Sequence, residues 1–254
     1  MRTPLLAGNW KMHGLRSEAR SLADAVVEGC QGIGGREVML APPYTSLVEV
    51  TAAAVGSEVG VGAQDMYWEN SGAFTGEVSG AMLKDVGCSH VIIGHSERRQ
   101  LFGSTDYTVA KKTSAALAAG LTPVVCVGES LEQREEGKTM DVVARQVAGG
   151  LCEVPRDCFD RLVIAYEPVW AIGTGKTASP EQAEEVHAHI RTVLAEVTEN
   201  QAISDIIRII YGGSVKPANV DELMACPNID GALVGGASLN ADDFLRIVHY
   251  EESR

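Results

Sequence analysis

Residues 162–176 read L-V-I-A-Y-E-P-V-W-A-I-G-T-G-K, and this stretch decides the fold. Its first four residues are continuously apolar, which is typical of a short buried strand. Glu167 stands where that strand ends, and Pro168 both ends the strand ladder and restricts the direction of the chain. The apolar residues 169–172 and the bendable residues 173–175 then predict a hinged lid beside the carboxylate. A surface loop around a buried tryptophan is the alternative.

Eight apolar or β-branched runs of this kind recur along the chain, separated by segments with helical periodicity. The expected strands are 5–7, 38–41, 59–63, 90–93, 121–127, 162–165, 206–211 and 232–234. The expected helices are 16–30, 44–55, 79–86, 105–119, 139–151, 180–197, 217–224 and 242–250. Strand and helix therefore alternate eight times.

The apolar character of these strands is continuous, which indicates a parallel sheet that is covered on both faces. Eight βα units in 254 residues favour an α/β fold in the form of a closed (β/α)8 barrel, although an open doubly wound sheet fits the same alternation. No proline-rich or glycine/serine linker and no block of like charge divides the chain. We therefore expect a single domain over residues 1–254.

The composition excludes several classes of function. Lys and Arg number 21 and Asp and Glu 34, a formal net charge of −13, which disfavours non-specific binding to nucleic acid or to a membrane. No apolar run is long enough for a membrane helix or a secretory signal, so we expect a cytoplasmic protein. The six cysteines lack C-x-x-C spacing, which favours free thiols over a metal or redox site.

Polar residues and glycines collect where the predicted strands end, which is where a barrel of this kind carries its chemistry. They are Asn9, Lys11, Gln64, His95, Glu167, Gly212, Gly213, Ser214, Gly235, Gly236 and Ser238. Because the carboxyl ends of parallel strands meet at one end of a barrel, we expect these residues to converge there.

Three of these side chains can act together on a carbonyl compound. Glu167 can remove a proton from carbon if a closing lid desolvates it. His95 precedes an expected helix start, whose positive end favours a neutral imidazole that donates a hydrogen bond. Lys11 is a compact cation that suits a phosphate or an enolate oxygen. An exposed glutamate, a structural histidine and a surface lysine are the ordinary alternatives.

Two glycine-rich turns, Y-G-G-S at 211–214 and V-G-G-A-S at 234–238, follow the last two strands. Glycine lets backbone amides approach an anion closely, and barrels often bind phosphate in these two loops. With Gly173 available from the predicted lid, they favour a phosphate nest. An acid, an imidazole and a cation around this nest, without a nucleophile elbow or metal ligands, predict proton abstraction beside a carbonyl. Glu97 either orients Lys11 or pairs with a neighbouring arginine.

These residues resemble the triosephosphate isomerase family closely. The matching pieces are G-N-W-K-M (8–12), A-P-P-Y (41–44), G-A-F-T-G-E-V-S (72–79), G-H-S-E-R-R (94–99), V-C-V-G-E (125–129), Y-E-P-V-W-A-I-G-T-G-K (166–176), Y-G-G-S-V (211–215) and V-G-G-A-S-L (234–239). They occur in the family's order over nearly the whole chain, and the lid stretch is the most specific of them.

The resemblance implies a TIM barrel that interconverts dihydroxyacetone phosphate and D-glyceraldehyde 3-phosphate through an enediol(ate), in glycolysis and gluconeogenesis, with no cofactor and no metal. By the roles established for this family, Glu167 is the base and His95 the electrophile, while Lys11 and Asn9 stabilise the negative oxygen. The resemblance assigns phosphate binding to Gly173, Ser214, Gly235 and Gly236, and a supporting role to Glu97 and Cys126.

Family members are usually dimers, so the resemblance also implies a homodimer through the loop 72–79, with Phe74 and Thr75 at its tip. Two other functions fit the residues. A Schiff-base aldolase would use Lys11 as its nucleophile. A barrel that binds phosphate without turnover would keep the glycine-rich turns and lack the chemistry.

Overall fold

The computed structural model describes residues 2–172 and 177–251, in which eight parallel strands form a closed barrel. The strands are β1 (Leu5–Asn9), β2 (Glu37–Ala41), β3 (Val59–Ala63), β4 (His90–Ile93), β5 (Thr122–Val127), β6 (Val163–Tyr166), β7 (Arg208–Tyr211) and β8 (Gly231–Val234). Each strand pairs with the next, and β8 pairs with β1, so that Gly8 lies opposite Val234. The predicted closed barrel is confirmed and the open sheet is excluded.

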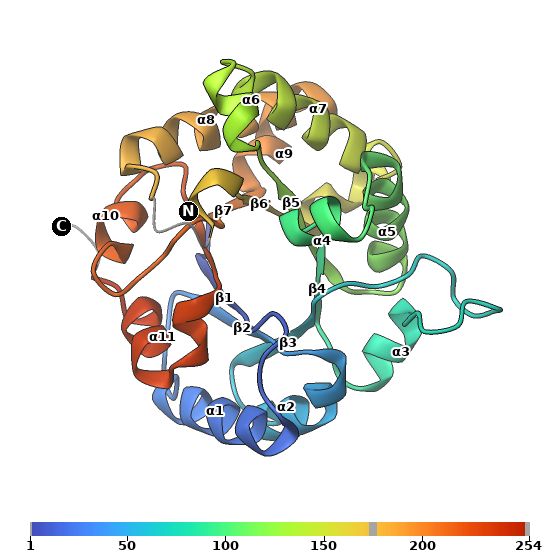
Figure 1. Ribbon diagram of the computed structural model, residues 1–254, viewed down its shortest axis with the longest axis vertical. Helices are drawn as coiled ribbons and strands as arrows, with labels where there is room; N and C mark the ends of the chain where they lie inside the picture. Colours follow the sequence, from blue (N-terminus) through green and yellow to red (C-terminus); the bar gives the residue numbers. More distant parts are fainter. Residues whose placement is uncertain (1, 173–176, 252–254) are drawn as a thin grey trace.

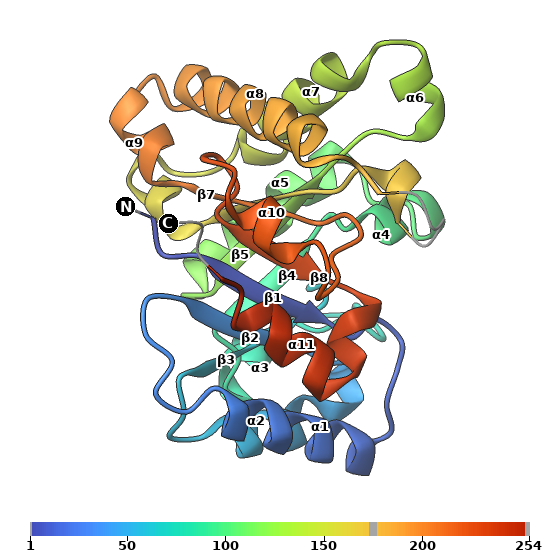
Figure 2. The same cartoon turned by 90° about the vertical axis from the view of Figure 1, so that its left-hand side faces the viewer.

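Helices form a ring outside the strands (Figure 1). The eight expected helices are present, with ends that differ by a few residues: α1 (Arg16–Gly29), α2 (Leu47–Ala54), α3 (Gly80–Asp85), α5 (Asp106–Ala118), α7 (Thr139–Leu151), α8 (Pro180–Thr198), α10 (Val220–Met224) and α11 (Ala241–Val248). Figure 2 shows that α1, α2 and α11 lie on one side of the strands and α7, α8 and α9 on the other.

Some short elements differ from the sequence expectations. The helix start expected after His95 is confirmed as α4 (Ser96–Leu101), and the 3-10 turn Tyr44–Ser46 forms the first residues of the expected helix 44–55. The helices α6 (Leu131–Glu135) and α9 (Gln201–Ile206) are additional, as are the 3-10 helices Arg156–Arg161, Val169–Ala171 and Gly236–Leu239. The expected start of the seventh strand at residue 206 is wrong. Ile206 ends α9, which Asn200 caps by accepting the Ala202 N–H, and the strand begins at Arg208. The run of isoleucines at 206–210, which only Arg208 interrupts, hides this change of backbone, because a short apolar run does not distinguish a strand from the end of a helix.

The core has two layers, one inside the barrel and one between the strands and the helices. The inner layer consists of Leu5, Ala7, Met39, Ala41, Ile92, Val124, Cys126, Val163, Ala165, Ile210 and Leu233. These residues alternate along their strands with residues of the outer layer, such as Leu6 and Ile164. Both faces of the strands are therefore buried, which explains the continuous apolar runs.

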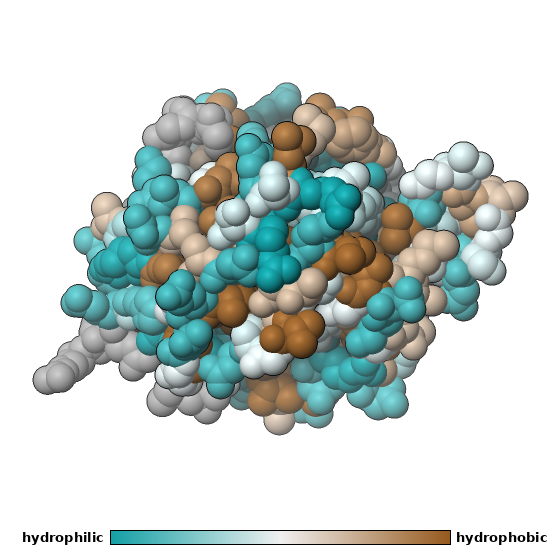
Figure 3. Space-filling view, turned by 90° about the horizontal axis from the view of Figure 1, so that it is seen from below, coloured by the Kyte–Doolittle hydropathy of each residue, from teal (hydrophilic) through white to brown (hydrophobic). Residues whose placement is uncertain are grey.

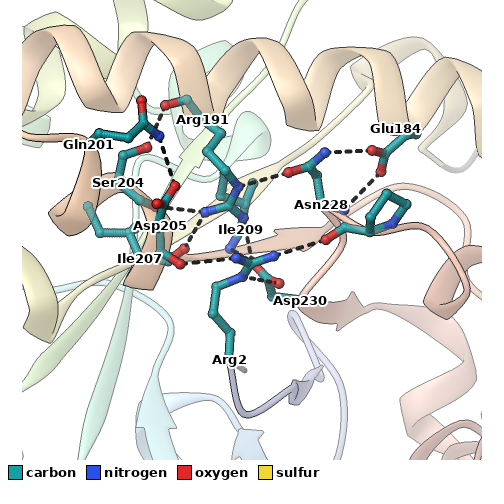
Figure 4. A network of polar contacts seen from close by, with 11 residues as sticks. Arg2, Glu184, Arg191, Gln201, Ser204, Asp205, Ile207, Ile209, Asn228 and Asp230 are labelled. Carbon is teal, nitrogen blue, oxygen red and sulfur yellow. Dashed lines mark hydrogen bonds and ion pairs between the residues drawn. The ribbon is translucent and has the colours of Figure 1, made fainter.

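A buried polar network joins the amino-terminal ends of the last two strands to α8 and α9 (Figure 4). Asp230, which precedes β8, accepts hydrogen bonds from Arg191 at 2.8 Å, from Arg2 at 2.5 Å and from the backbone N–H of Ile209 at 2.9 Å. Arg191 also donates to the carbonyl oxygen of Ser204 at 2.7 Å. This network lies at the end of the barrel opposite the predicted site, where residues of a barrel serve stability.

Candidate active site

A cavity of about 510 Å³ opens at the carboxyl ends of the strands. Nine of the residues predicted at the strand ends line it together: Asn9, Lys11, His95, Glu167, Gly212, Gly213, Ser214, Gly235 and Gly236. Gly173 lies outside the described residues. Four predicted residues lie outside this lining. Gln64 and Glu97 each form a hydrogen bond with Lys11. Cys126 is fully buried in the inner core layer, and Ser238 is fully buried where its hydroxyl donates to the Gly235 carbonyl oxygen at 2.7 Å.

Glu167 lies at the mouth of the barrel, and only 2% of its surface is exposed. It continues the inward-facing series of β6, Val163 and Ala165, by one further alternation. Its carboxylate accepts the backbone N–H of Ser96 at 2.9 Å and lies 2.9 Å from Nε2 of His95. Burial alone disfavours the charge, but His95 and the Ser96 N–H outweigh it and lower the pKa of Glu167. The carboxylate is therefore ionised, and the exposed-glutamate alternative is excluded.

His95 precedes α4, and its ring nitrogen Nδ1 accepts the backbone N–H of Glu97 at 3.2 Å. The proton of the neutral imidazole is therefore on Nε2 and points at Glu167. Burial lowers the pKa of His95, but the Glu167 carboxylate raises it by more, so the pKa is raised overall. The sequence predicts that the start of the helix favours a neutral imidazole. The Glu167 carboxylate outweighs this effect on the pKa of His95 while it stays in contact with the ring.

Lys11 lies in a strained conformation beside these two residues. Its φ of +50° belongs to the left-handed region, which costs a lysine about 1–2 kcal/mol. Its backbone N–H donates to Oδ1 of Asn9 at 3.0 Å, and its Nζ donates to Oε1 of Glu97 at 2.5 Å. The predicted contact between Glu97 and Lys11 is therefore present.

The arginines that could have paired with Glu97 have other partners. Arg98 pairs with Asp65 at 2.5 Å, and Arg99 pairs with Asp106 at 2.7 Å. Glu97 is thus left to Lys11, although its side chain is 41% exposed.

The first glycine-rich turn packs too closely for side chains at Gly212 and Gly213. A Cβ on Gly212 would lie 2.9 Å from Cγ of Glu167, and one on Gly213 would lie 2.2 Å from the hydroxyl of Tyr211. The side-chain amide of Asn219 donates to the Ser214 carbonyl oxygen at 3.0 Å and holds the first turn in place. Residues of both turns line the cavity, at the place where the sequence predicts an anion nest.

The start of the predicted lid is a 3-10 turn, Val169–Ala171, and residues 173–176 lie outside the described residues. The indole N–H of Trp170 donates to Glu129 at 2.9 Å, and the hydroxyl of Tyr166 donates to the same carboxylate at 3.1 Å. Glu129 is fully buried and also contacts Arg134 at 3.2 Å. The first part of the lid is therefore tied to the end of β5.

A model of the triosephosphate isomerase family matches residues 4–251. The chain belongs to this family. Several relatives are named triosephosphate isomerase. The protein of Pelobacter propionicus is 56% identical to this chain, and the match covers 98% of this chain and 99% of the relative. The protein of Trichlorobacter lovleyi is also 56% identical, and the match covers 99% of this chain and 100% of the relative. The protein of Chloroflexus aurantiacus is 55% identical, and the match covers 99% of this chain and 100% of the relative. The resemblance seen in the motifs is confirmed.

Three residues beside the cavity received no role from the sequence. Ser96 stands inside the family motif G-H-S-E-R-R, and Glu129 ends the motif V-C-V-G-E, so a signal for both was present. Gln64 follows the third strand, and it forms hydrogen bonds with the backbone of Lys11 and Ala41.

Among the described residues, no three His, Cys, Asp or Glu side chains gather in a way that could hold a metal ion. None of the described helices is long and apolar enough to cross a bilayer.

Proposed function

We propose that this protein interconverts dihydroxyacetone phosphate and D-glyceraldehyde 3-phosphate through an enediol(ate), as a step of glycolysis and gluconeogenesis. The observation that carries the proposal is the contact of 2.9 Å between the ionised Glu167 and Nε2 of His95, with Lys11 in the same cavity. A base, a hydrogen-bond donor and a cation are the groups that enolisation beside a carbonyl requires. Membership of the triosephosphate isomerase family supports it.

In the forward direction, Glu167 takes a proton from C1 of dihydroxyacetone phosphate and returns it to C2. His95 donates its Nε2–H to the carbonyl oxygen in place of Glu167 and takes up the proton of the C1 hydroxyl in return, so that C2 carries the new hydroxyl and C1 becomes the aldehyde. The negative charge that develops on oxygen is stabilised by Lys11 and Asn9. The loss of the His95 contact, which lowers the pKa of Glu167, makes the carboxylate a stronger base once the substrate is bound.

The phosphate is held at the two glycine-rich turns, by backbone N–H groups near Ser214, Gly235 and Gly236, together with Gly173. This assignment rests on the close packing at Gly212 and Gly213 and on the positions of Ser214, Gly235 and Gly236 in the cavity lining. Glu97 orients Lys11, and Cys126 supports the floor beneath Glu167.

A coupled assay tests the proposal against the two other functions. Purified protein receives D-glyceraldehyde 3-phosphate, and glycerol-3-phosphate dehydrogenase reports the product through NADH consumption. Fast turnover supports the isomerase. Turnover that is absent while phosphate is bound would favour a non-catalytic barrel, and trapping by borohydride would favour an aldolase. The ion pair between Lys11 and Glu97 disfavours the aldolase, because a Schiff-base lysine needs a free amine.

We further propose that the protein is a cytoplasmic homodimer, with residues 1–254 as one domain. The segment between β3 and α3 protrudes from the barrel (Figure 1), and within it Tyr67 packs on Phe74 with ring centroids 4.7 Å apart. Phe74 is nevertheless 39% exposed. The space-filling view shows that hydrophobic and hydrophilic residues are mixed on the face that carries α1 and α2 (Figure 3). Exposed hydrophobic residues of the chain include Met12, Leu15 and Val48. An exposed aromatic residue on a protruding loop suits a self-complementary interface.

A further inference from the structure

Gln64 follows β3 and is absent from the described lining of the cavity, yet it contacts a residue that lines it. Its side-chain Nε2 donates one hydrogen bond to the carbonyl oxygen of Lys11 at 2.8 Å and another to the carbonyl oxygen of Ala41 at 2.8 Å. Ala41 is the last residue of β2, and its carbonyl oxygen also accepts the N–H of Trp10 at 3.1 Å. One amide group thus joins the ends of two strands to the backbone of Lys11.

The orientation of this amide is fixed by its partners. Both partners are carbonyl oxygens, which accept hydrogen bonds only, and the NH2 group is the part of the side chain that can donate two. The flipped amide would place its own oxygen against both carbonyl oxygens. Glutamine therefore fits this position, whereas a glutamate of the same shape would have acceptors where two donors are required.

The residue that Gln64 contacts has an unusual backbone. Lys11 has φ of +50°, and such a conformation persists in a lysine only where the surroundings hold it. Asn9 accepts the N–H of Lys11 at 3.0 Å, and Gln64 donates to its carbonyl oxygen. The peptide groups on both sides of the Lys11 Cα are therefore held by side-chain amides, and together they fix the direction in which the side chain leaves.

We propose that Gln64 is a positioning residue, which holds Lys11 in its left-handed conformation and so directs the ammonium group to the negative oxygens of the bound ligand. The inference rests on the proposed function, since it takes Lys11 to be the cation that acts on the substrate. Without the Gln64 contact, the Lys11 backbone can relax to negative φ, which redirects the side chain. The ammonium group is then displaced although it is still present.

A double-mutant cycle with Lys11 tests this role. The probe is 2-phosphoglycolate, whose phosphate and carboxylate resemble the phosphate and the planar oxygens of an enediolate, and its Kd is measured by calorimetry. Gln64→Met has similar length and no donors, and it is compared in the wild-type and Lys11→Met backgrounds. Thermal unfolding confirms that each variant is folded. If the methionine variant does not fold, Gln64→Glu enters the same cycle.

We expect Gln64→Met to weaken binding by about 10- to 100-fold when Lys11 is present, because displacing a charged group by about 1 Å costs this much. In the Lys11→Met background the same substitution should change Kd by less than about 2-fold, since there is no ammonium group left to position. Equal weakening in both backgrounds would show a general structural role and overturn the proposal. Binding within about 2-fold of the wild type in Gln64→Met would overturn it as well.

Gln146 provides a matched control. It is another largely buried glutamine whose amide contacts the backbone beyond a strand end, accepting from the Gly128 N–H at 2.7 Å and donating to the Gly128 carbonyl oxygen at 3.2 Å. We expect Gln146→Met to have the same effect in both backgrounds, because its amide bonds the backbone of Gly128 and not that of Lys11. The cycle also separates the two hypotheses: a wild-type protein that binds 2-phosphoglycolate without isomerase turnover defeats the proposed function, while the cycle still reports on Gln64.

Discussion

At the scale of single residues, the contact of 2.9 Å between Nε2 of His95 and Oε1 of Glu167 governs the charge of both groups. Burial opposes ionisation of each, and the partner restores it: the pKa of His95 is raised and that of Glu167 is lowered. The sequence places both residues at strand ends but contains no signal for this contact. The distance between the ends of β4 and β6 is set by the closure of the barrel, which the sequence of either strand does not reveal. The strain at Lys11 is likewise invisible in the sequence, since lysine has no special preference for positive φ.

Replacing Glu167 by glutamine should lower the pKa of His95 from its wild-type value. The amide removes the negative charge that offsets burial, so the neutral imidazole becomes the favoured form. The titration of the His95 ring, followed by NMR, measures the effect. Glu97→Gln is the control and should lower the pKa by less, because Glu97 raises it less than Glu167 does. A His95 titration that is the same in Glu167→Gln and in wild type would refute the coupling.

At the scale of elements, the strands could be predicted because both of their faces are buried, whereas α6 and α9 are too short for their periodicity to stand out. Long-range pairs between elements were also out of reach. Glu37 at the start of β2 lies 3.1 Å from Nε2 of His90 on β4 and forms an ion pair with Arg208 on β7. These three strands are not neighbours in the barrel, so the contacts cross its amino-terminal end.

The Glu37 contacts should make stability depend on pH. The hydrogen bond with His90 lowers the pKa of Glu37 to about 2, and Arg208 lowers it further against the opposing effect of burial. The contribution of Glu37 to the free energy of unfolding is fully present above pH 4.5, the ordinary pKa of a glutamate, and is lost as the pH falls towards 2. Because the side chain is 34% exposed, solvent screening reduces this contribution to about 1–2 kcal/mol.

Urea unfolding between pH 6.5 and pH 2.5 measures this contribution. Glu37→Gln should be less stable than wild type at pH 6.5, and its free energy of unfolding should fall less steeply below pH 4.5. Glu49→Gln, which removes an exposed ion pair with Arg16, is the control and should change the pH dependence less. Parallel curves for wild type and Glu37→Gln would contradict the assignment.

At the scale of the whole molecule, the barrel brings nine predicted site residues from distant parts of the chain to one cavity. This convergence could be predicted, because all parallel strands end on the same side. The protruding segment between β3 and α3 could be predicted only as a family feature. Its amino-acid composition does not reveal that it leaves the barrel surface, and its packing of Tyr67 on Trp68 and Phe74 is visible only in three dimensions.

Phe74→Asp should convert the proposed dimer into a monomer, because it buries a charge in the apolar interface. Light scattering during size-exclusion chromatography measures the molecular mass, which should halve. Ile206→Asp is the matched control: Ile206 is 52% exposed and ends α9, on the opposite side of the barrel from α2 (Figure 2). Its mass should stay that of the wild type. A wild-type protein that is already monomeric would contradict the proposed interface.

The most direct test of the central claim is the kcat of Glu167→Gln in the coupled assay with D-glyceraldehyde 3-phosphate. Loss of a general base should lower kcat by about 10²–10⁴-fold. The variant should still bind 2-phosphoglycolate, because the two glycine-rich turns are unchanged. Glu135→Gln, an exposed glutamate on α6, controls for the substitution itself and should turn over like the wild type. Near-normal turnover by Glu167→Gln would show that another group removes the proton.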